Sequence, residues 1–165
     1  MLAEAIGGAG EQAHEQAMPS SRFTNTRSSL TGDNVGVSPQ DPECRVVVCD
    51  DQPGYRKIVS AVLDLEPGLV VVGEAANGQE AVNLVKELRP DVLVLDIAMP
   101  VLDGLEALPL IQAASPETKV VMLTGVASDA FRDRAREGGA ALFIEKGTNI
   151  QDVVEAVAGV CGGPS

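Results

Sequence analysis

Asp91–Pro100 has the sequence DVLVLDIAMP, and its pattern decides how the rest of the chain is interpreted. Four consecutive apolar residues, Val92 to Leu95, predict a strand that is buried on both faces. The strand ends on a carboxylate, Asp96, at the end of the strand where open α/β sheets keep their functional sites. An aspartate in this place more often starts a loop or caps a helix. The surrounding sequence must therefore decide whether Asp96 has a chemical role.

Composition and charge limit the classes of protein to which the chain can belong. Its 165 residues suffice for one domain and a tail, and 45% hydrophobic against 2% aromatic residues predict an aliphatic core. The 24 acidic and 12 basic residues give a formal net charge of -12. Nucleic-acid phosphates and anionic membrane surfaces repel such a chain, so we expect it to bind neither directly. Partners with basic surfaces and bound cations fit this charge better.

The chain shows no sign of export or of insertion into a membrane. It has no run of about 18 apolar residues, and the segment before Arg22 contains acids but no Lys or Arg. We therefore predict a cytoplasmic protein. Its three cysteines, Cys44, Cys49 and Cys161, lack zinc-ligand spacing, and reduced, partly buried thiols are the default for a cytoplasmic chain.

Two parts of the chain differ in composition. Residues 1–43 are rich in Ala, Gly, Gln and Ser and sustain no apolar face, which predicts a disordered tail. The only histidine, His14, lies in this tail, and we assign it no catalytic role. Apolar runs recur further on, so a folded domain is predicted over residues 44–161, followed by a short tail over 162–165.

Five short apolar runs predict five buried strands. They are Val46–Cys49, Leu69–Val72, Val92–Leu95, Val120–Leu123 and Ala141–Ile144. Between them apolar residues recur at helical spacing, most clearly in the second interval, at Ala81, Leu84, Val85 and Leu88. This alternation is typical of a doubly wound α/β fold, with parallel strands, right-handed crossovers and helices on both faces of the sheet.

Local signals predict where the helices begin and how regular they are. The candidate N-caps are Asn77, Asp103 in a capping box with Glu106, Ser128 and Thr148. Pro109 lies several residues into the third helix, where it would cost roughly 3 kcal/mol, so we expect a kink or a later helix start. The fourth helix has few apolar residues, which predicts light packing.

Polar residues follow four of the predicted strands. Asp50 and Asp51 follow the first, Asp96 the third, Thr124 the fourth and Lys146 the fifth. The carboxyl ends of parallel strands meet at one edge of a sheet, and three carboxylates there need a cation such as Mg²⁺ among them. Each residue alone has an ordinary explanation as a solvated turn or a cap, but their joint placement is hard to obtain by chance. The set predicts a site for a phosphate-like group at or near Asp96.

The same residues belong to a wider pattern. It consists of Asp50-Asp51, Asp96–Pro100 followed by Asp103-Gly104, Thr124, and Phe143 three residues before Lys146. In this combination the chain resembles the receiver domain of bacterial two-component response regulators, over the whole predicted domain. The resemblance implies a flavodoxin-like (βα)5 fold with the strand order 2-1-3-4-5.

The resemblance also implies a role for each residue. Asp96 would accept a phosphoryl group from the phosphohistidine of a sensor histidine kinase or a histidine phosphotransfer protein. Lys146 would contact the phosphoryl oxygens, while Thr124 and Phe143 would act as the switch. The Mg²⁺ ligands would be Asp50, Asp51 and Asp96. The protein would thus be a phosphoacceptor that assists its own phosphorylation and dephosphorylation, not an enzyme acting on other substrates.

Two features leave the output open. Gly147 follows the lysine where the family often has proline, so the resemblance does not determine the shape of this loop. Lys146-Gly147 and Pro100–Leu108 are most similar to receivers that precede a DNA-binding helix-turn-helix, and none follows in these 165 residues. We predict a single-domain response regulator that acts on an unknown downstream protein, with dimerisation left open. The alternatives are the receiver part of a LuxR-type transcription regulator and a phosphorylation-independent binding scaffold.

Overall fold

The computed structural model describes residues 42–162. The tails predicted over residues 1–43 and 162–165 lie outside the described residues except for 42, 43 and 162, and so does His14. The domain boundaries therefore stay a prediction. Within the described part of the chain, none of the helices combines the length and apolarity needed to cross a bilayer.

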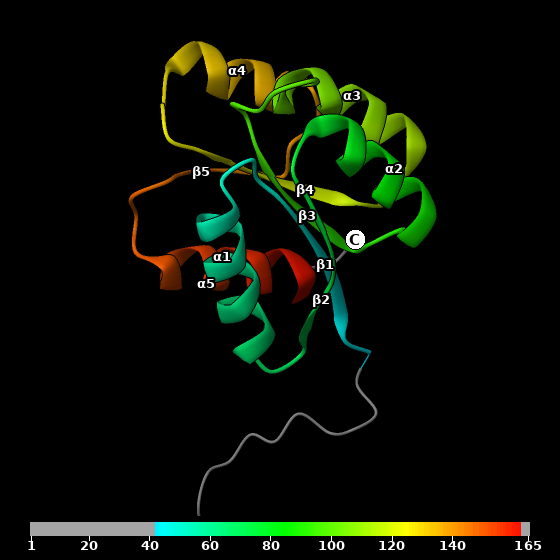
Figure 1. Ribbon diagram of the computed structural model, residues 1–165, viewed down its shortest axis with the longest axis vertical. Coiled ribbons are helices and arrows are strands. Elements are labelled where there is room, and N and C mark those ends of the chain that lie inside the picture. Colours follow the sequence, from blue (N-terminus) through cyan, green and yellow to red (C-terminus); the bar gives the residue numbers. More distant parts are fainter. Residues whose placement is uncertain (1–41, 163–165) are drawn as a thin grey trace, which may run out of the picture. The chain divides into compact units, whose positions relative to one another are not determined.

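Strands and helices alternate along the described chain (Figure 1). The strands are β1 (Cys44–Cys49), β2 (Leu69–Ala75), β3 (Val92–Asp96), β4 (Lys119–Thr124) and β5 (Leu142–Glu145). The helices are α1 (Pro53–Leu65), α2 (Gly78–Leu88), α3 (Gly104–Ala114), α4 (Asp129–Glu137) and α5 (Ile150–Gly162). All neighbouring strands pair in parallel, in the order β2-β1-β3-β4-β5. The predicted fold class and strand order are confirmed.

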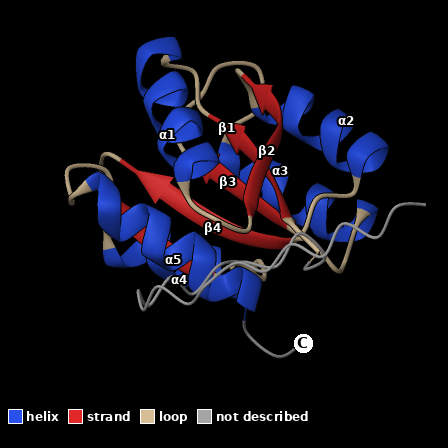
Figure 2. Cartoon of the chain, turned by 90° about the horizontal axis from the view of Figure 1, so that it is seen from below, coloured by secondary structure: helices blue, strands red, loops and turns tan. Residues whose placement is uncertain are grey.

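The sheet separates two aliphatic cores because successive residues of a strand point to opposite faces. In β3, Leu93 and Leu95 pack with residues of α2, α3 and α4, whereas Val92 and Val94 pack with residues of α1 and α5. Figure 2 shows α1 and α2 on opposite sides of the strands. All five residues of β3 are buried, which confirms the buried strand predicted over Val92–Leu95.

The fifth strand differs from its prediction. Ala141 precedes β5, and the side chain of Leu142 is 39% exposed, so this strand is not buried on both faces. The strand order explains the difference, because β5 lies at the edge of the sheet and pairs only with β4. An apolar run alone cannot distinguish an edge strand from a central one.

Three of the four predicted helix caps are confirmed. The side chains of Asn77, Asp103 and Ser128 each accept a hydrogen bond from the backbone N–H three residues on, at 2.9, 2.8 and 3.2 Å. The prediction that Thr148 caps the fifth helix is wrong, because α5 begins at Ile150. The Thr148 hydroxyl instead donates to the Glu145 carbonyl at 2.8 Å, and Asn149 Oδ1 accepts from the Gln151 N–H at 3.2 Å.

The third helix begins where its capping box predicts. It runs from Gly104 to Ala114 with Pro109 inside it, so the expectation of a later start is wrong, while the alternative of a kink stays a prediction. Proline at this position removes one intrahelical hydrogen bond, and its ring lies on the exposed side of the helix. The fourth helix is lightly packed as predicted, with Ala135 as its buried residue.

The prediction for the cysteines is wrong for two of the three. Cys44 and Cys161 form a disulfide between β1 and α5, with Cα atoms 6.0 Å apart and a sequence separation of 117. Cys49 is a buried free thiol. The sequence hides this pairing, because only the tertiary fold brings the start of the first strand to the end of the last helix.

A strained turn links β3 to α3. The Leu102 N–H donates to the Pro100 carbonyl at 2.8 Å, which closes a three-residue turn around Val101. Val101 has φ 69°, a conformation that β-branched residues rarely adopt, and its side chain is 81% exposed. Strain at this position is therefore not offset by burial of the side chain.

Replacing Val101 by glycine should stabilise the protein. Glycine adopts positive φ without strain, and after allowance for its greater freedom in the unfolded chain we expect the free energy of unfolding to rise by about 1 kcal/mol. Urea denaturation measures the change. Val126→Gly is the control, because Val126 is also exposed, at 66%, but has no positive φ, and its replacement should not stabilise. A lower urea midpoint for Val101→Gly would contradict the prediction.

Candidate functional site

The predicted site residues meet at the carboxyl ends of the strands. Asp50 follows β1, Asp96 ends β3, Thr124 ends β4 and Lys146 follows β5. Asp50 and Asp96 are each 2% exposed, whereas Asp51 is exposed to solvent. The sheet topology therefore brings together side chains that are up to 96 positions apart in the sequence, from Asp50 to Lys146.

Three of these carboxylates form a group that can bind a cation. Asp50, Asp51 and Asp96 each offer one carboxylate oxygen, and these oxygens all lie within 4.8 Å of one another. Mg²⁺ binds oxygen at about 2.0–2.1 Å, so opposed ligands of one ion lie a little over 4 Å apart, and small side-chain movements would bring these oxygens to that spacing. The exposed Asp51 leaves one side of the group open to water or to a phosphate oxygen. The chemistry and spacing of the donor set thus suit Mg²⁺.

Lys146 reaches into the same group from the loop after β5. Its ammonium lies 2.5 Å from Asp50 Oδ2, 3.0 Å from Asp96 Oδ2, and 4.9 Å from the centroid of the Tyr55 ring. Burial lowers the pKa of Lys146, but hydrogen bonds to Asp50 and Asp96 outweigh this effect and raise the pKa above its usual value. Lys146 therefore keeps its positive charge at neutral pH, beside the carboxylate expected to react.

The carboxyl group of Asp96 is harder to ionise than usual. Burial raises its pKa from 3.8 to about 6, and the hydrogen bond from Lys146 opposes this rise only in part. Without a bound cation the site therefore has more negative charge than Lys146 compensates. A divalent cation would favour the ionised form that a nucleophilic carboxylate requires.

Thr124 and Phe143 are placed differently with respect to the site. The Thr124 side chain lines the site, but its hydroxyl donates to the Val126 carbonyl and accepts from the Val126 N–H, both at 3.2 Å. Phe143 lies away from the carboxylates, packed with the core on the α2, α3 and α4 side, and the Arg132 guanidinium lies 5.2 Å from its ring centroid. The structure thus brings Thr124 to the site but not Phe143.

A cavity of about 600 Å³ opens beside Asp96. Its walls are Asp51, Gln52, Asp96, Ile97, Ala98, Thr124, Gly125, Val126, Phe131 and Lys146. This volume exceeds the space that a phosphoryl group needs. The aromatic side chain on its wall is Phe131 of α4, which the sequence analysis did not assign to the site.

Sequence reasoning also missed residues that hold the site in shape. Arg56 donates to the Asp50 carbonyl at 2.6 Å and forms an ion pair with Glu74 at 3.1 Å, which fixes the turn after β1. Tyr55 places its ring beside Lys146. Both lie in the first turns of α1, directly after the acidic pair. Their position at the sheet edge was a signal that could have found them.

Two glycines shape the loops that carry Asp96 and Lys146. A Cβ at Gly104 would overlap the Asp96 carbonyl, and the Gly104 N–H donates to the Ile97 carbonyl at 2.8 Å. Gly147 has φ 106°, which proline, with φ fixed near -65°, cannot adopt. The loop after Lys146, whose shape the sequence did not determine, thus has a backbone conformation that suits Gly147 and excludes proline.

The family model of the response regulator receiver domain matches residues 46–158. This chain belongs to that family. It is 38% identical over 119 residues to the transcriptional regulatory protein LnrK of Bacillus subtilis. This similarity covers 72% of this chain and 54% of LnrK. It is 40% identical over 118 residues to the Bacillus subtilis protein CcdB, covering 72% of this chain and 98% of CcdB.

Among solved structures, the signal receiver domain of the putative response regulator NarL from Mycobacterium tuberculosis has 34% identity and a TM-score of 0.71. The similarity covers 74% of this chain and 99% of that domain. NarL-type receivers are thus among its structural relatives. The chain spans about half the length of curated relatives such as LnrK, so the similarity concerns their receiver part.

Asp96→Asn should stabilise the metal-free protein, and more so at higher pH. A folded-state pKa above the usual value means that ionisation of Asp96 opposes folding, so its contribution to stability is present below about pH 4 and lost as the pH rises through about 6. The difference in free energy of unfolding between variant and wild type should therefore grow by roughly 2–3 kcal/mol from pH 4 to pH 8. Denaturation in the presence of a chelator measures it.

Asp152→Asn is the control for this experiment, since it removes an exposed carboxylate on α5. Its pH-dependent difference from the wild type should be much smaller. A pH-independent difference for Asp96→Asn would show that burial does not govern the ionisation of Asp96.

Proposed function

We propose that this receiver domain accepts a phosphoryl group on Asp96 in a reaction that requires Mg²⁺. The observation that carries the proposal is one group of side chains: a buried Asp96 that contacts Lys146 at 3.0 Å, with two more carboxylates within 4.8 Å and a solvent-open cavity beside it. The donor would be a phosphohistidine on a sensor histidine kinase or a histidine phosphotransfer protein. The acidic chain, with a net charge of -12, suits a donor with a basic docking surface.

In this mechanism an oxygen of Asp96 attacks phosphorus, and the phosphorus–nitrogen bond to the donor histidine breaks. Phosphoryl transfer depends mainly on positioning and on neutralising charge. Lys146 supplies a fixed positive charge next to the oxygens of the transferred group. Mg²⁺, held by Asp50, Asp51 and Asp96, would supply further charge neutralisation. Arg56 keeps the turn that carries Asp50 in place through its bond to the Asp50 carbonyl.

The response to phosphorylation is proposed to start at Thr124. Its hydroxyl is engaged with Val126 in the loop before α4, and turning toward a phosphoryl oxygen would break both hydrogen bonds. The following helix is held by little buried surface, so its position can change at low cost. Inward rotation of Phe143 would end its contact with Arg132. The altered surface would include α4 and β5.

The output has two candidates, each with its own support. Similarity to CcdB over 98% of that protein favours a single-domain regulator that acts through protein contacts. Similarity to LnrK over 54% of its length favours a receiver that belongs to a transcription regulator. The genomic reading frame beyond Ser165 distinguishes them: a stop codon favours the first candidate, and a helix-turn-helix in the same frame favours the second.

Phosphorylation is tested with acetyl phosphate and Mg²⁺, followed by mass spectrometry of the intact protein. We expect one phosphate on the wild type, none on Asp96→Asn, and none when a chelator removes Mg²⁺. Asp152→Asn, with its change on the exposed face of α5, should be phosphorylated like the wild type. Labelling of Asp96→Asn at the wild-type level would refute the proposal, and a phosphorylation-independent scaffold would then be favoured.

Removing the Tyr55 ring should slow phosphorylation without abolishing it. The ring lies 4.9 Å from the Lys146 ammonium, and a cation–π contact of about 0.5–2 kcal/mol corresponds to roughly a twofold to thirtyfold effect on rate. We therefore expect Tyr55→Leu to lower the rate of phosphorylation within this range. Tyr55→Phe keeps the ring and should stay near the wild-type rate. Equal rates for Tyr55→Leu and Tyr55→Phe would show that the ring does not position Lys146.

A further inference from the structure

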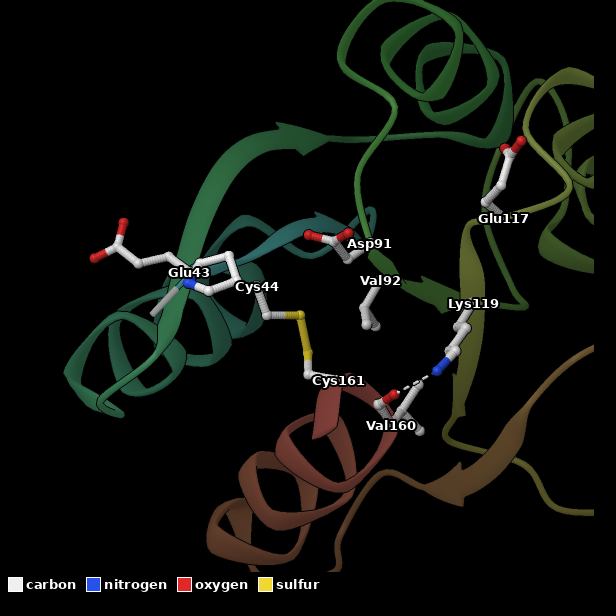
Figure 3. A pocket seen from close by; sticks show the side chains of 9 residues that line it. Glu43, Cys44, Asp91, Val92, Glu117, Lys119, Val160 and Cys161 are labelled. Carbon is white, nitrogen blue, oxygen red and sulfur yellow. Dashed lines mark hydrogen bonds between the residues drawn. A yellow bond between two sulfur atoms is a disulfide. The ribbon is translucent and has the colours of Figure 1, made fainter. Parts of the chain in front are cut away.

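The disulfide between Cys44 and Cys161 lies outside the phosphorylation site. Cys44 is the first residue of β1, whereas Asp96 is the last residue of the parallel, neighbouring β3, so the two sites are at opposite edges of the sheet. Figure 3 shows the disulfide beside a pocket, with the end of α5 on one side and β4 on the other. Nothing in the proposed phosphoryl transfer uses these sulfur atoms.

Among the residues that the structure describes, a disulfide and a hydrogen bond link the end of α5 to the sheet. One is the disulfide to β1, and the other is the hydrogen bond that the Lys119 ammonium of β4 donates to the Val160 carbonyl at 2.9 Å (Figure 3). The buried residues of this helix, Val153, Val154 and Val157, all precede its last turn. Ala158 and Val160 near the end of the helix are only partly buried against the core, so the disulfide and the hydrogen bond from Lys119 reinforce a small apolar contact there.

We propose that Cys44 and Cys161 form a reversible thiol–disulfide exchange site that reacts with small cationic thiols and controls how firmly the end of α5 is held. Both cysteines are only half-buried, and they line a pocket of about 220 Å³ that gives a small thiol room to approach. The site is formed by two cysteines whose Cα atoms are 6.0 Å apart in the fold, within the normal range for a disulfide.

The third cysteine does not compete in this chemistry. Cys49 is a free cysteine that is only 1% exposed, so an external thiol has no access to its sulfur. Exchange is therefore confined to Cys44 and Cys161.

The reaction balances with two equivalents of an external thiol. A thiolate attacks one sulfur of the pair, the sulfur–sulfur bond breaks, and the other cysteine leaves as a thiolate that takes up a proton. A second external thiolate attacks the mixed disulfide and releases the remaining cysteine. The external thiols give two electrons and are oxidised to their own disulfide, while the protein gains two thiols. A small disulfide with the same substituent reverses these steps.

Charge around the pocket selects the reagent. Its lining includes three carboxylates, of Glu43, Asp91 and Glu117, against the one ammonium of Lys119, and the whole chain has a net charge of -12. Figure 3 shows the Glu43 and Glu117 side chains extending away from the sulfurs, so they act through the electrostatic field and not by contact. This field concentrates cations near the disulfide and repels anions, and added salt screens it.

Opening the disulfide should loosen the end of α5 and lower stability. The link restricts the unfolded chain between residues separated by 117 positions, so its loss should lower the melting temperature by on the order of 10 °C. Hydrogen exchange should rise in the last turn of α5 and stay low at Val153, Val154 and Val157, whose side chains remain buried.

The first experiment compares the full chain before reduction, after reduction with cysteamine, and after reoxidation with cystamine. Alkylation under denaturing conditions and mass spectrometry should find one free thiol, then three, then one, and the melting temperature should fall and recover in step. In Cys49→Ala the pair should behave identically, with zero, two and zero free thiols. In Cys44→Ser/Cys161→Ser, cysteamine should not change the melting temperature. Three free thiols before reduction, or a melting temperature that does not respond to reduction, would overturn the proposal.

The second experiment tests the selection by charge. Reduction rates are measured with cationic cysteamine and anionic 2-mercaptoethanesulfonate, each divided by its rate with a small uncharged disulfide. At low salt the normalised rate should be several-fold higher for cysteamine, and the ratio should approach one near 1 M salt. Equal normalised rates at low salt would overturn the assignment of cationic thiols as the reagents.

Discussion

The contact of the Lys146 ammonium with the carboxylates of Asp50 and Asp96 is the interaction on which the site depends. The three groups come from the ends of three different strands, so they meet only if the sheet is parallel and β1 lies beside β3. Removing the Lys146 ammonium would leave two buried carboxylates without their counter-charge, which costs about 3–5 kcal/mol. The Lys146 N–H also donates to the Thr124 carbonyl at 2.6 Å, which ties its loop to the end of β4. The lysine thus joins the charge of the site to the register of the sheet.

This arrangement leaves the site short of positive charge. Asp50 and Asp96 are buried with one ammonium between them, and Asp51 adds a third carboxylate nearby. Burial is the main cause of the raised pKa of Asp96, and the charge of Asp50 adds to it. A divalent cation would offset this negative charge, and adding a phosphoryl group would change the balance again. The excess of negative charge that destabilises the folded state would therefore also make the site sensitive to a bound cation or phosphoryl group.

The sequence predicts those parts of the site that topology alone determines. Asp50, Asp96, Thr124 and Lys146 follow apolar strands, and parallel strands necessarily bring such residues to one edge. Features that depend on side-chain direction were not predictable in this way. The Thr124 hydroxyl points to Val126, and Phe131 of α4 lines the cavity where Phe143 of β5 does not. The disulfide escaped prediction because its two cysteines meet only in the completed fold.

The two edges of the sheet differ in how they are held, and this difference limits where a change at Asp96 can spread. The disulfide and the bond from Lys119 to Val160 fix the last turn of α5 at the amino-terminal edge of β1 and β4. On the other side, α4 has one buried residue, and the ion pair from Arg132 to Glu145 joins two half-exposed side chains, so it adds little stability. A force arising at Thr124 therefore meets less resistance toward α4 and β5 than toward the end of α5. Reduction of the disulfide would remove one of the links that hold the end of α5, so the proposed redox chemistry of Cys44 and Cys161 would also change how far α5 can move with α4 and β5.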